Sequence, residues 1–361
     1  MRSKGCGPYL YGIVAFFSLL LMSETFAIGG QWLSKLVGNS LSTESSVSKT
    51  TTSKANTSVW RQGREYVSIR SVLSPLGAHF TSPDARSLKV SRGPAVLDFT
   101  RDGNCFFYNN CKIFLGVPFF WEKQQLYVAK CDFISKIEPL IHPQGVVSKV
   151  SSPKTIVLDA GHGGKDPGTS ARGICEKTWT LDVVKGLRDQ LTQLGYHVVL
   201  TRDQDKFVSL ADRVAITKRA QADLFVSIHF NACASKSAHG FEIFTFPAQG
   251  TSATHTGTRL KSQSSVSVAN HMFSGWNTVL AYSIHSCIKE AFPNLGERGV
   301  KQGRLLVLRN NPCPSILIEV AFMTNEKDFA LFTRAEKRHE LARAIVGGIQ
   351  KYAANLQHIQ H

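Results

Sequence analysis

The sequence lacks several features that would place it in other protein classes. Only one long apolar run is present among the 361 residues, over Tyr9–Met22, which excludes a protein with several membrane spans. The net charge of +16 is not concentrated in a basic tail, which argues against a nucleic-acid-binding arm and favours work near an anionic polymer or surface. No Cys-x-x-Cys pair occurs, so a cysteine-based zinc knuckle is not expected. With 43% apolar and 19% charged residues, wholesale disorder is excluded and a sizeable core is expected.

The N-terminus has the order of a secretory signal peptide. Arg2 and Lys4 precede the apolar run, and a short stretch ending in the small residue Ala27 follows it. We therefore predict cleavage after Ala27 and export to the periplasm or cell envelope. An uncleaved anchor is the alternative, and this segment would then be the only contact with a membrane.

Seven of the eight cysteines remain after such a cleavage, and an exported protein can pair some of them. Cys105 and Cys111 flank Tyr108-Asn109-Asn110, which has the composition of a hairpin turn. We therefore expect that these two cysteines can face each other. The odd number leaves at least one thiol free.

The composition changes along the chain and divides it into four segments. A Ser/Thr-rich stretch without periodic apolar positions indicates a flexible linker after the signal peptide. Short apolar segments separated by turn residues then predict a small β-rich domain, and alternating strand and helix patterns predict an α/β domain. The expected segments are the signal peptide 1–27, the linker 28–59, the β-rich domain 60–150 and the α/β domain 151–361.

The α/β pattern predicts a mixed, mostly parallel sheet with helices on both faces. We expect strands over 155–159, 197–202, 224–230, 241–246, 305–308 and 316–322. We expect helices over 176–194, 209–220, 277–292 and 334–354. In such a sheet, ligands bind at the carboxyl ends of the strands.

Two histidines and two glutamates fall at these ends or at a helix start. His162 follows the first strand in a glycine-rich loop, His229 lies near the end of another, and Glu176 opens the first helix. Two histidines and one carboxylate are a typical catalytic zinc set, since three protein ligands leave the fourth position for water. Glu319 lies in the otherwise apolar run 316–322, where a carboxylate needs a strong reason, and a nearby glutamate can act as general base.

Each of these residues also has an ordinary structural explanation. A histidine at a strand end is most often structural, and Glu176 could simply favour the helix dipole. The loop after the first strand does not match a phosphate-binding loop, because Lys165 is followed by Asp166 rather than Ser or Thr. The joint placement of the four residues is therefore the observation that points to a metal site.

The motifs in chain order resemble the zinc-dependent N-acetylmuramoyl-L-alanine amidases, which trim peptidoglycan. They are Asp159-Ala160-Gly161-His162-Gly163-Gly164, Glu176-Lys177, Thr201-Arg202-Asp203, Leu210-Ala211-Asp212-Arg213, Ser227-Ile228-His229-Phe230-Asn231-Ala232, Gly240-Phe241-Glu242, Arg298-Gly299-Val300-Lys301 and Glu319-Val320-Ala321-Phe322-Met323-Thr324-Asn325. The resemblance covers nearly all of 154–355. In the β-rich domain, Tyr66-Val67-Ser68-Ile69-Arg70 and Leu126-Tyr127-Val128 resemble the N-terminal-like domain of copper amine oxidases, which implies wall tethering.

The amidase resemblance implies one Zn²⁺ per catalytic domain, held by His162, Glu176 and His229, with Glu319 as the catalytic glutamate. It also implies hydrolysis of the amide that joins N-acetylmuramic acid to the L-alanine of the stem peptide, in wall remodelling and cell division. We expect Arg298, Lys301, Arg309 and Asn231 to contact substrate, with an ordinary surface charge as the alternative for each of the three cations. Peptidoglycan is the expected partner, with an envelope activator protein as a further one and no nucleic acid.

The insert over 247–276 is rich in Gly, Ser and Thr and is expected to be a long loop bordering the site. No Asp or Glu occurs between Glu242 and Glu290. Some members of the resembled family block their zinc with a carboxylate from an inserted helix, and we expect that this insert cannot. His255 and His271 are the insert's alternative groups for the open metal position.

Two other functions stay open. A zinc carboxypeptidase on the stem peptide would use the same kind of site, and a penicillin-type serine activity is a variant suggested by Ser286-x-x-Lys289 on one helix face. A wall-binding protein with an inactive site is the second alternative. It predicts the loss of a ligand or of the base, whereas all four residues are present.

Overall fold

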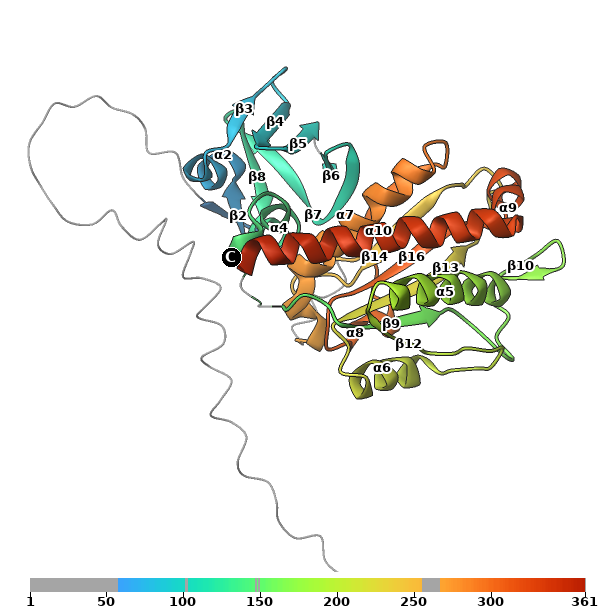
Figure 1. The fold of residues 1–361 in the computed structure, drawn as a ribbon. Coiled ribbons are helices and arrows are strands. Elements are labelled where there is room, and N and C mark those ends of the chain that lie inside the picture. The colour runs from blue at the N-terminus through green and yellow to red at the C-terminus, as the bar shows by residue number, and fades with distance from the viewer. Residues whose placement is uncertain (1–57, 101–102, 147, 149, 255–266, 361) are drawn as a thin grey trace, which may run out of the picture. The chain divides into compact units, whose positions relative to one another are not determined.

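The computed structural model describes residues 58–100, 103–146, 148, 150–254 and 267–360 (Figure 1). The expected signal peptide and all but the last two residues of the expected linker lie outside these ranges. Within them, no helix combines the length and the apolar character that crossing a membrane requires.

One mixed sheet forms the centre of the α/β part. Its strands lie in the order β12-β9-β13-β16-β14-β15. The first four are mutually parallel, β14 runs antiparallel to β16, and β15 is parallel to β14. The bounds are β9 (Thr155–Ala160), β12 (His197–Leu200), β13 (Leu224–Asn231), β14 (Phe241–Thr245), β15 (Glu297–Gln302) and β16 (Ser315–Phe322). The expected mixed, mostly parallel sheet is confirmed.

Helices cover this sheet, which explains why its central strands are mostly apolar. The helices α5 and α7 contact the sheet strands and also pack against α10, while α8 contacts β16 and α6 (Figure 1). The bounds are α5 (Glu176–Gln193), α6 (Leu210–Arg219), α7 (Ser274–Ala291), α8 (Leu306–Arg309), α9 (Glu326–Thr333) and α10 (Ala335–Gln360). Val307 and Leu308 of α8 belong to a buried cluster with Val157, Phe225 and Leu317 of the sheet.

Antiparallel strands make up the part before residue 130, as the turn-separated apolar segments predict. They are β1 (Ser58–Arg61), β2 (Arg64–Ser68), β3 (His79–Thr81), β4 (Ser87–Arg92), β5 (Ala95–Thr100), β6 (Gly103–Tyr108), β7 (Cys111–Glu122) and β8 (Gln125–Ala129). The short helices here are α2 (Ile69–Leu73), α3 (Lys130–Asp132) and α4 (Glu138–Ile141), with η2 (Phe133–Ile137) between the last two. Asn109 and Asn110 turn the chain from β6 to β7 at positive φ angles of 46° and 62°, which suits a tight hairpin.

The long strand β7 joins the β-rich part to the α/β part. It pairs with β6 on one side and with β15 on the other, where Ile113 lies opposite Val300. Beyond the sheet, Lys136 of η2 donates to the hydroxyls of Thr245 and Thr278 at 3.1 and 3.2 Å. The strands of the β-rich segment are therefore continuous with the α/β sheet and do not pack as a separate unit.

Three details of the sequence expectation are wrong. The segment 305–308 is expected as a strand, but it forms the helix α8, because so short an apolar run carries no periodicity that separates the two. The strand β15 was not expected, since only one of its residues is a large aliphatic. Cys105 lies opposite Phe114 and Cys111 opposite Tyr108, so the two cysteines do not face each other, and both are free.

Candidate metal centre

Acidic and imidazole side chains meet on one face of the sheet, near the carboxyl ends of the parallel strands. His229 of β13 is the register partner of Glu319 on β16, and Ser227 is the partner of Asp159 on β9. Glu242 of β14 is the antiparallel partner of Glu319. Because side chains alternate between faces along a strand, this register places the three carboxylates and the imidazole on a common face.

The side chains of His162, Glu176 and His229 converge at this edge. One donor atom from each lies within 4.8 Å of the others. Glu176 Oε1 lies 3.2 Å from His162 Nε2 and 3.0 Å from His229 Nδ1, and the two imidazole rings stand edge to face with centroids 4.8 Å apart. These are the three residues that the sequence selects as ligands.

Backbone groups hold the Glu176 carboxylate in place. The N–H of Phe230 donates to its Oε1 at 2.9 Å, and the N–H of Thr169 donates to its Oε2 at 2.9 Å. Glu176 is the first residue of α5, directly after the short strand β11 (Ile174–Cys175), and it is only 3% exposed. Its orientation is thus fixed before any ligand binds.

Glycines allow the backbone to approach the two histidines. A Cβ at Gly161 would lie 2.4–2.7 Å from the ring of His229. At Gly168, which has a φ of +65°, a Cβ would lie 2.6 Å from both the Glu176 carboxylate and the His162 ring. Only glycine fits these two positions without a shift of the metal-centre side chains.

Electrostatic coupling within the cluster is strong. Burial disfavours the charged forms, but hydrogen bonds and charge interactions with Glu176 and Asp166 raise the pKa of His162 to about 9. The same kind of interaction with Glu176 raises the pKa of His229, although burial opposes it. Burial by itself would raise the pKa of Glu176. Hydrogen bonds and charge interactions with both histidines outweigh it and hold the pKa of the carboxyl well below its usual range. The three groups therefore form one coupled unit.

Glu319 is a further carboxylate of the site, and its charge helps to raise the pKa of His229. Its Oε2 is buried and has no hydrogen-bond partner among the described residues. Burial raises the pKa of Glu319 to about 7, with His229 acting in the opposite direction and Glu176 and Glu242 adding to the rise. A buried carboxylate oxygen without a partner costs free energy, and such groups are typical of sites that bind a ligand, an ion or a water molecule.

Two buried arginines shape the loop that carries His162. Arg213 bonds to the Asp159 carboxylate and donates to the carbonyls of Ala160 and His162 at 2.8 and 2.9 Å. Arg202 donates to the carbonyls of Ala160 and Gly161 at 3.0 and 2.8 Å. Arg202 belongs to the Thr-Arg-Asp motif and Arg213 to the Leu-Ala-Asp-Arg motif. Both motifs therefore serve to support this loop.

Sequence reasoning assigned no role to Asp166 or Glu242. Asp166 Oδ2 lies 2.9 Å from His162 Nδ1, which leaves Nε2 facing Glu176. Glu242 is 1% exposed and accepts hydrogen bonds from Asn231, Arg298 and Lys301. The signal for Asp166 was its spacing of four residues from His162, and Glu242 was recognisable as a carboxylate in a buried strand.

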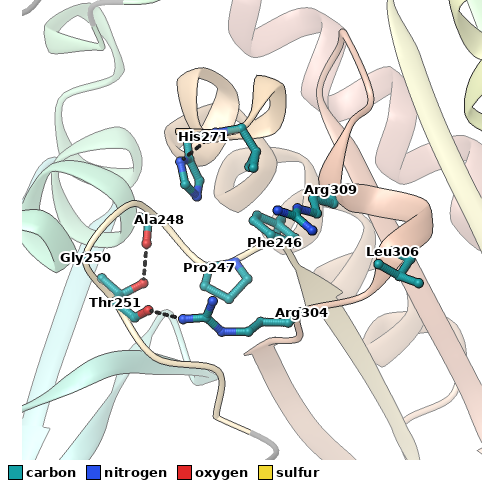
Figure 2. Close-up of a pocket in the computed structure, with 10 residues that line it drawn as sticks. Phe246, Pro247, Ala248, Gly250, Thr251, His271, Arg304, Leu306 and Arg309 are labelled. Atoms are coloured by element: carbon teal, nitrogen blue, oxygen red, sulfur yellow. Dashed lines mark hydrogen bonds between the residues drawn. The ribbon is translucent and has the colours of Figure 1, made fainter. Parts of the chain in front are cut away.

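The expected substrate-contacting residues separate into two groups. Asn231, Arg298 and Lys301 lie next to the metal centre but are bound to Glu242, with the Arg298 side chain 35% and the Lys301 side chain 13% exposed. Arg309 lies elsewhere. It lines a pocket of about 140 Å³ with Arg304, His271 and Phe246 (Figure 2).

This pocket is at the opposite edge of the sheet from Glu319. Phe246 follows Thr245, which pairs with Ile316 near the beginning of β16, whereas Glu319 pairs with Glu242 further along. The described flanks of the insert, including His271, line this pocket (Figure 2). His255 lies outside the described residues. Arg309 and the insert's flanks therefore do not border the site, contrary to expectation.

The donor set fits a zinc ion. Two imidazoles and a carboxylate are a usual catalytic zinc set, their donor atoms are within reach of one centre, and the glycine positions leave the space clear. Asp166 supplies the hydrogen bond to the second ring nitrogen that ligating histidines usually make.

Comparison with known proteins identifies the family. The family described as N-acetylmuramoyl-L-alanine amidase matches residues 156–351, which contain all four residues of the centre. The chain belongs to this amidase family. It is similar to the N-acetylmuramoyl-L-alanine amidase AmiC of Neisseria meningitidis, with 32% identity over 55% of this chain and 52% of that protein. It is also similar to the endolysin of Bacillus phage SPP1, with 36% identity over 54% of this chain and 65% of that protein.

The match to other amidases has the same extent on this chain. AmiA of Escherichia coli is 30% identical over 58% of this chain and 80% of that protein. Among solved structures, AmiC2 of Nostoc punctiforme has a TM-score of 0.46 and 32% identity over 55% of this chain and 96% of that one. This chain spans about half of the meningococcal amidase and two thirds of the phage endolysin.

Proposed function

We propose that this chain is a zinc-dependent peptidoglycan hydrolase that cleaves the amide between N-acetylmuramic acid and the L-alanine of the stem peptide. The observation that carries the proposal is the convergence of His162, Glu176 and His229 beside the unpaired carboxylate oxygen of Glu319. Membership of the amidase family supports the reaction class, and the charge of +16 suits an anionic wall polymer.

In this proposal, His162, Glu176 and His229 hold the zinc. A zinc ion so held polarises the scissile carbonyl and brings the pKa of a water molecule towards about 7. Glu319 accepts a proton from the attacking water and returns it to the alanine nitrogen as the C–N bond breaks. The products are the carboxylate of the lactyl group and a stem peptide with a free amino terminus.

The surroundings of these residues support that division of roles. Asp166 fixes the ring of His162 through Nδ1, and the Phe230 and Thr169 amides fix Glu176. Glu319 is free of such partners at Oε2, as a group that exchanges a proton with substrate requires. Neighbouring groups thus orient His162 and Glu176, while the proposed base keeps one oxygen without a partner among the described residues.

Arg298 and Asn231 are the proposed substrate contacts beside the zinc. Arg298 bonds to Glu242 through Nε, stacks over Phe322 at 4.8 Å and keeps a third of its side chain exposed. A guanidinium that is anchored on one side and open on the other suits a carboxylate of the stem peptide. The Lys301 side chain is less exposed and also pairs with Glu242, so we assign it the role of neutralising that carboxylate beside Glu319. Arg309 lies at the opposite edge of the sheet and is not one of the proposed substrate contacts.

The segments of the chain are proposed to serve export and wall targeting. Residues 1–27 act as a signal peptide and 28–59 as a linker. Residues 60–150 hold the enzyme at the wall, while 151–361 carry catalysis in wall remodelling and cell division. The cationic surface and the polymeric substrate favour the periplasm or envelope as the working compartment.

The test is digestion of purified peptidoglycan by the purified chain, followed by mass spectrometry of the products. We expect release of stem peptides that begin with L-alanine, loss of this release with a chelator, and recovery with added zinc. Release of D-alanine instead would show a carboxypeptidase. Binding to peptidoglycan without any product from the zinc-loaded chain would show a wall-binding protein.

A further inference from the structure

A second cluster of potential metal ligands lies away from the centre described above. Cys111 at the start of β7, His285 in α7 and Glu297 at the start of β15 place one donor atom each within 4.8 Å of the others. His285 Nε2 lies 2.9 Å from Glu297 Oε1, which also accepts the N–H of Lys112 at 3.2 Å. These three residues are named here the junction cluster, because they come from both parts of the chain.

The junction cluster is deeply buried. His285 is fully buried, Cys111 is 2% exposed, and the side chain of Glu297 is 17% exposed. The ring of His285 also packs against Phe241, with centroids 4.8 Å apart. A cysteine, a histidine and a glutamate could in principle form a nucleophilic triad, but a thiol and an imidazole this deeply buried cannot reach a substrate. Nucleophilic catalysis is therefore excluded as the role of the cluster.

The polar groups of the cluster are incompletely satisfied. His285 Nδ1 is buried and has no hydrogen-bond partner among the described residues. Within the described residues, the thiol of Cys111 makes a weak contact of 3.8 Å with the carbonyl of its neighbour Lys112. Unpaired buried polar atoms are costly, and native proteins rarely keep them without a bound group or water. Since Nε2 is the ring nitrogen that faces Glu297, the weakly partnered donor within the cluster is the Cys111 sulfur, which is therefore available as a metal ligand.

We propose that Cys111, His285 and Glu297 bind a second divalent metal ion, of the zinc type, that ties the β-rich part to the catalytic part. Thiolate, imidazole and carboxylate are the three donor types that zinc uses in proteins. Donor atoms around a tetrahedral zinc are roughly 3.3–3.8 Å apart for bonds of about 2.0–2.3 Å, so adjustments of about 1 Å complete the site. The carbonyl oxygen of Lys112 lies 3.8 Å from the thiol and is the proposed fourth ligand atom.

Charge balance favours a divalent ion in this position. A thiolate and a carboxylate bring two negative charges, the imidazole is neutral when it acts as a ligand, and the thiol proton leaves to solvent on binding. The nearby cation Lys289 donates to the Asn110 carbonyl at 2.8 Å, and its charge favours the anionic forms of Cys111 and Glu297. A dication thus neutralises the junction cluster, and it bridges β7, α7 and β15.

Cobalt substitution in the purified full chain tests this proposal. A cobalt–thiolate bond gives a strong charge-transfer band in the near ultraviolet, and none of the ligands proposed for the catalytic centre is a cysteine. The band therefore reports a thiolate ligand outside the proposed catalytic set, and the cysteine variants assign that thiolate. We expect it in the wild-type chain and in His162→Ala, and we expect its loss in Cys111→Ser. Cys313→Ser, which replaces another buried cysteine, is the matched control and should keep the band.

Metal content gives an independent measurement. We expect about two zinc equivalents in the wild-type chain, about one in Cys111→Ser and about one in His162→Ala. Absence of the cobalt band from the folded wild-type chain, with a single zinc equivalent, would overturn the junction site whether or not Cys111→Ser folds. Failure of the catalytic proposal has a different result, in which the band persists and the zinc content of His162→Ala equals that of the wild type.

Discussion

Glu319 lies directly opposite His229 across the parallel pair of β13 and β16, and its Oε2 is buried without a partner in the described part of the chain. The neighbouring carboxylate, Glu242, is instead fully engaged by Asn231, Arg298 and Lys301. Two neighbouring glutamates thus have different roles. One is neutralised by cations, and the other is left available for proton transfer.

Glu319→Gln tests the proposed base. The amide keeps the size of the side chain but cannot accept the proton, so we expect amidase activity to fall by at least about 100-fold. Zinc content should stay unchanged, because Glu319 is not one of the proposed ligands. Peptidoglycan digestion and metal analysis of the same sample measure both. Glu336→Gln, an exposed glutamate on α10, is the matched control. Undiminished hydrolysis in Glu319→Gln would reject this role.

Asp166→Asn tests the support of His162. Loss of the carboxylate at His162 Nδ1 should weaken zinc binding by about 10–100-fold, because such partners orient the ring and raise its basicity. Competition with a chromogenic chelator measures the affinity. Asp189→Asn changes a surface aspartate that pairs with its neighbour Arg188 and should leave the affinity as it is. Equal affinities for the two variants would show that Asp166 is dispensable.

Gly161→Ala tests the close approach of the loop to His229. The added methyl would lie within 2.7 Å of the ring, so the histidine must move and zinc binding should be lost or strongly reduced. In Gly186→Ala the new Cβ would lie an ordinary 3.5 Å from Ala342. That variant should bind zinc normally. Retention of zinc by Gly161→Ala would indicate that the loop can shift without disturbing the ligands.

Adjacent glycines on α10 should respond in opposite ways to the same change. At Gly347 a Cβ would lie 3.8 Å from Cys287 Sγ, so alanine should stabilise the fold by about 0.5–1 kcal/mol through helix propensity. At Gly348 it would lie 2.4 Å from the Cα of Ile284 in α7, and we expect destabilisation by about 1–3 kcal/mol. Urea unfolding of the two variants measures the difference, and a shared sign would contradict the packing of α10 on α7.

Lys136→Met tests the buried lysine between the two parts of the chain. Burial lowers the pKa of Lys136 to about 8, with Asp132 opposing the shift, so the native state binds fewer protons than the unfolded chain between about pH 8 and 10.5. The contribution of Lys136 to stability therefore rises with pH across this window, by up to about 3 kcal/mol.

The unfolding free energy of wild type and Lys136→Met, measured in urea at several pH values from 8 to 10.5, checks this sign. We expect the wild type to gain stability relative to Lys136→Met as the pH rises. A difference that stays constant would mean that Lys136 titrates as it does in the unfolded chain. Lys185→Met, an exposed lysine on α5, is the control and should show no such trend.

The sequence by itself determined the α/β architecture and the zinc-ligand candidates. The apolar runs that become β9, β13 and β16 and the periodic helix α5 are set by burial, which acts on neighbouring residues and so is visible in a local pattern. His162, Glu176, His229 and Glu319 stood out because polar groups at the ends of such runs, or inside them, need a reason.

The tertiary structure alone decided which charges are paired and which segments meet. Arg298 and Lys301 are already bound to Glu242. Arg309 lies at the far edge of the sheet, because β15 is parallel to β14 and both run opposite to β16, so that the chain reaches α8 near the beginning of β16. Cys111 faces His285 and Glu297 rather than Cys105, since β7 pairs with β15 across more than 180 residues of chain. Contacts of such long range depend on strand order and register, which no local pattern of residues encodes.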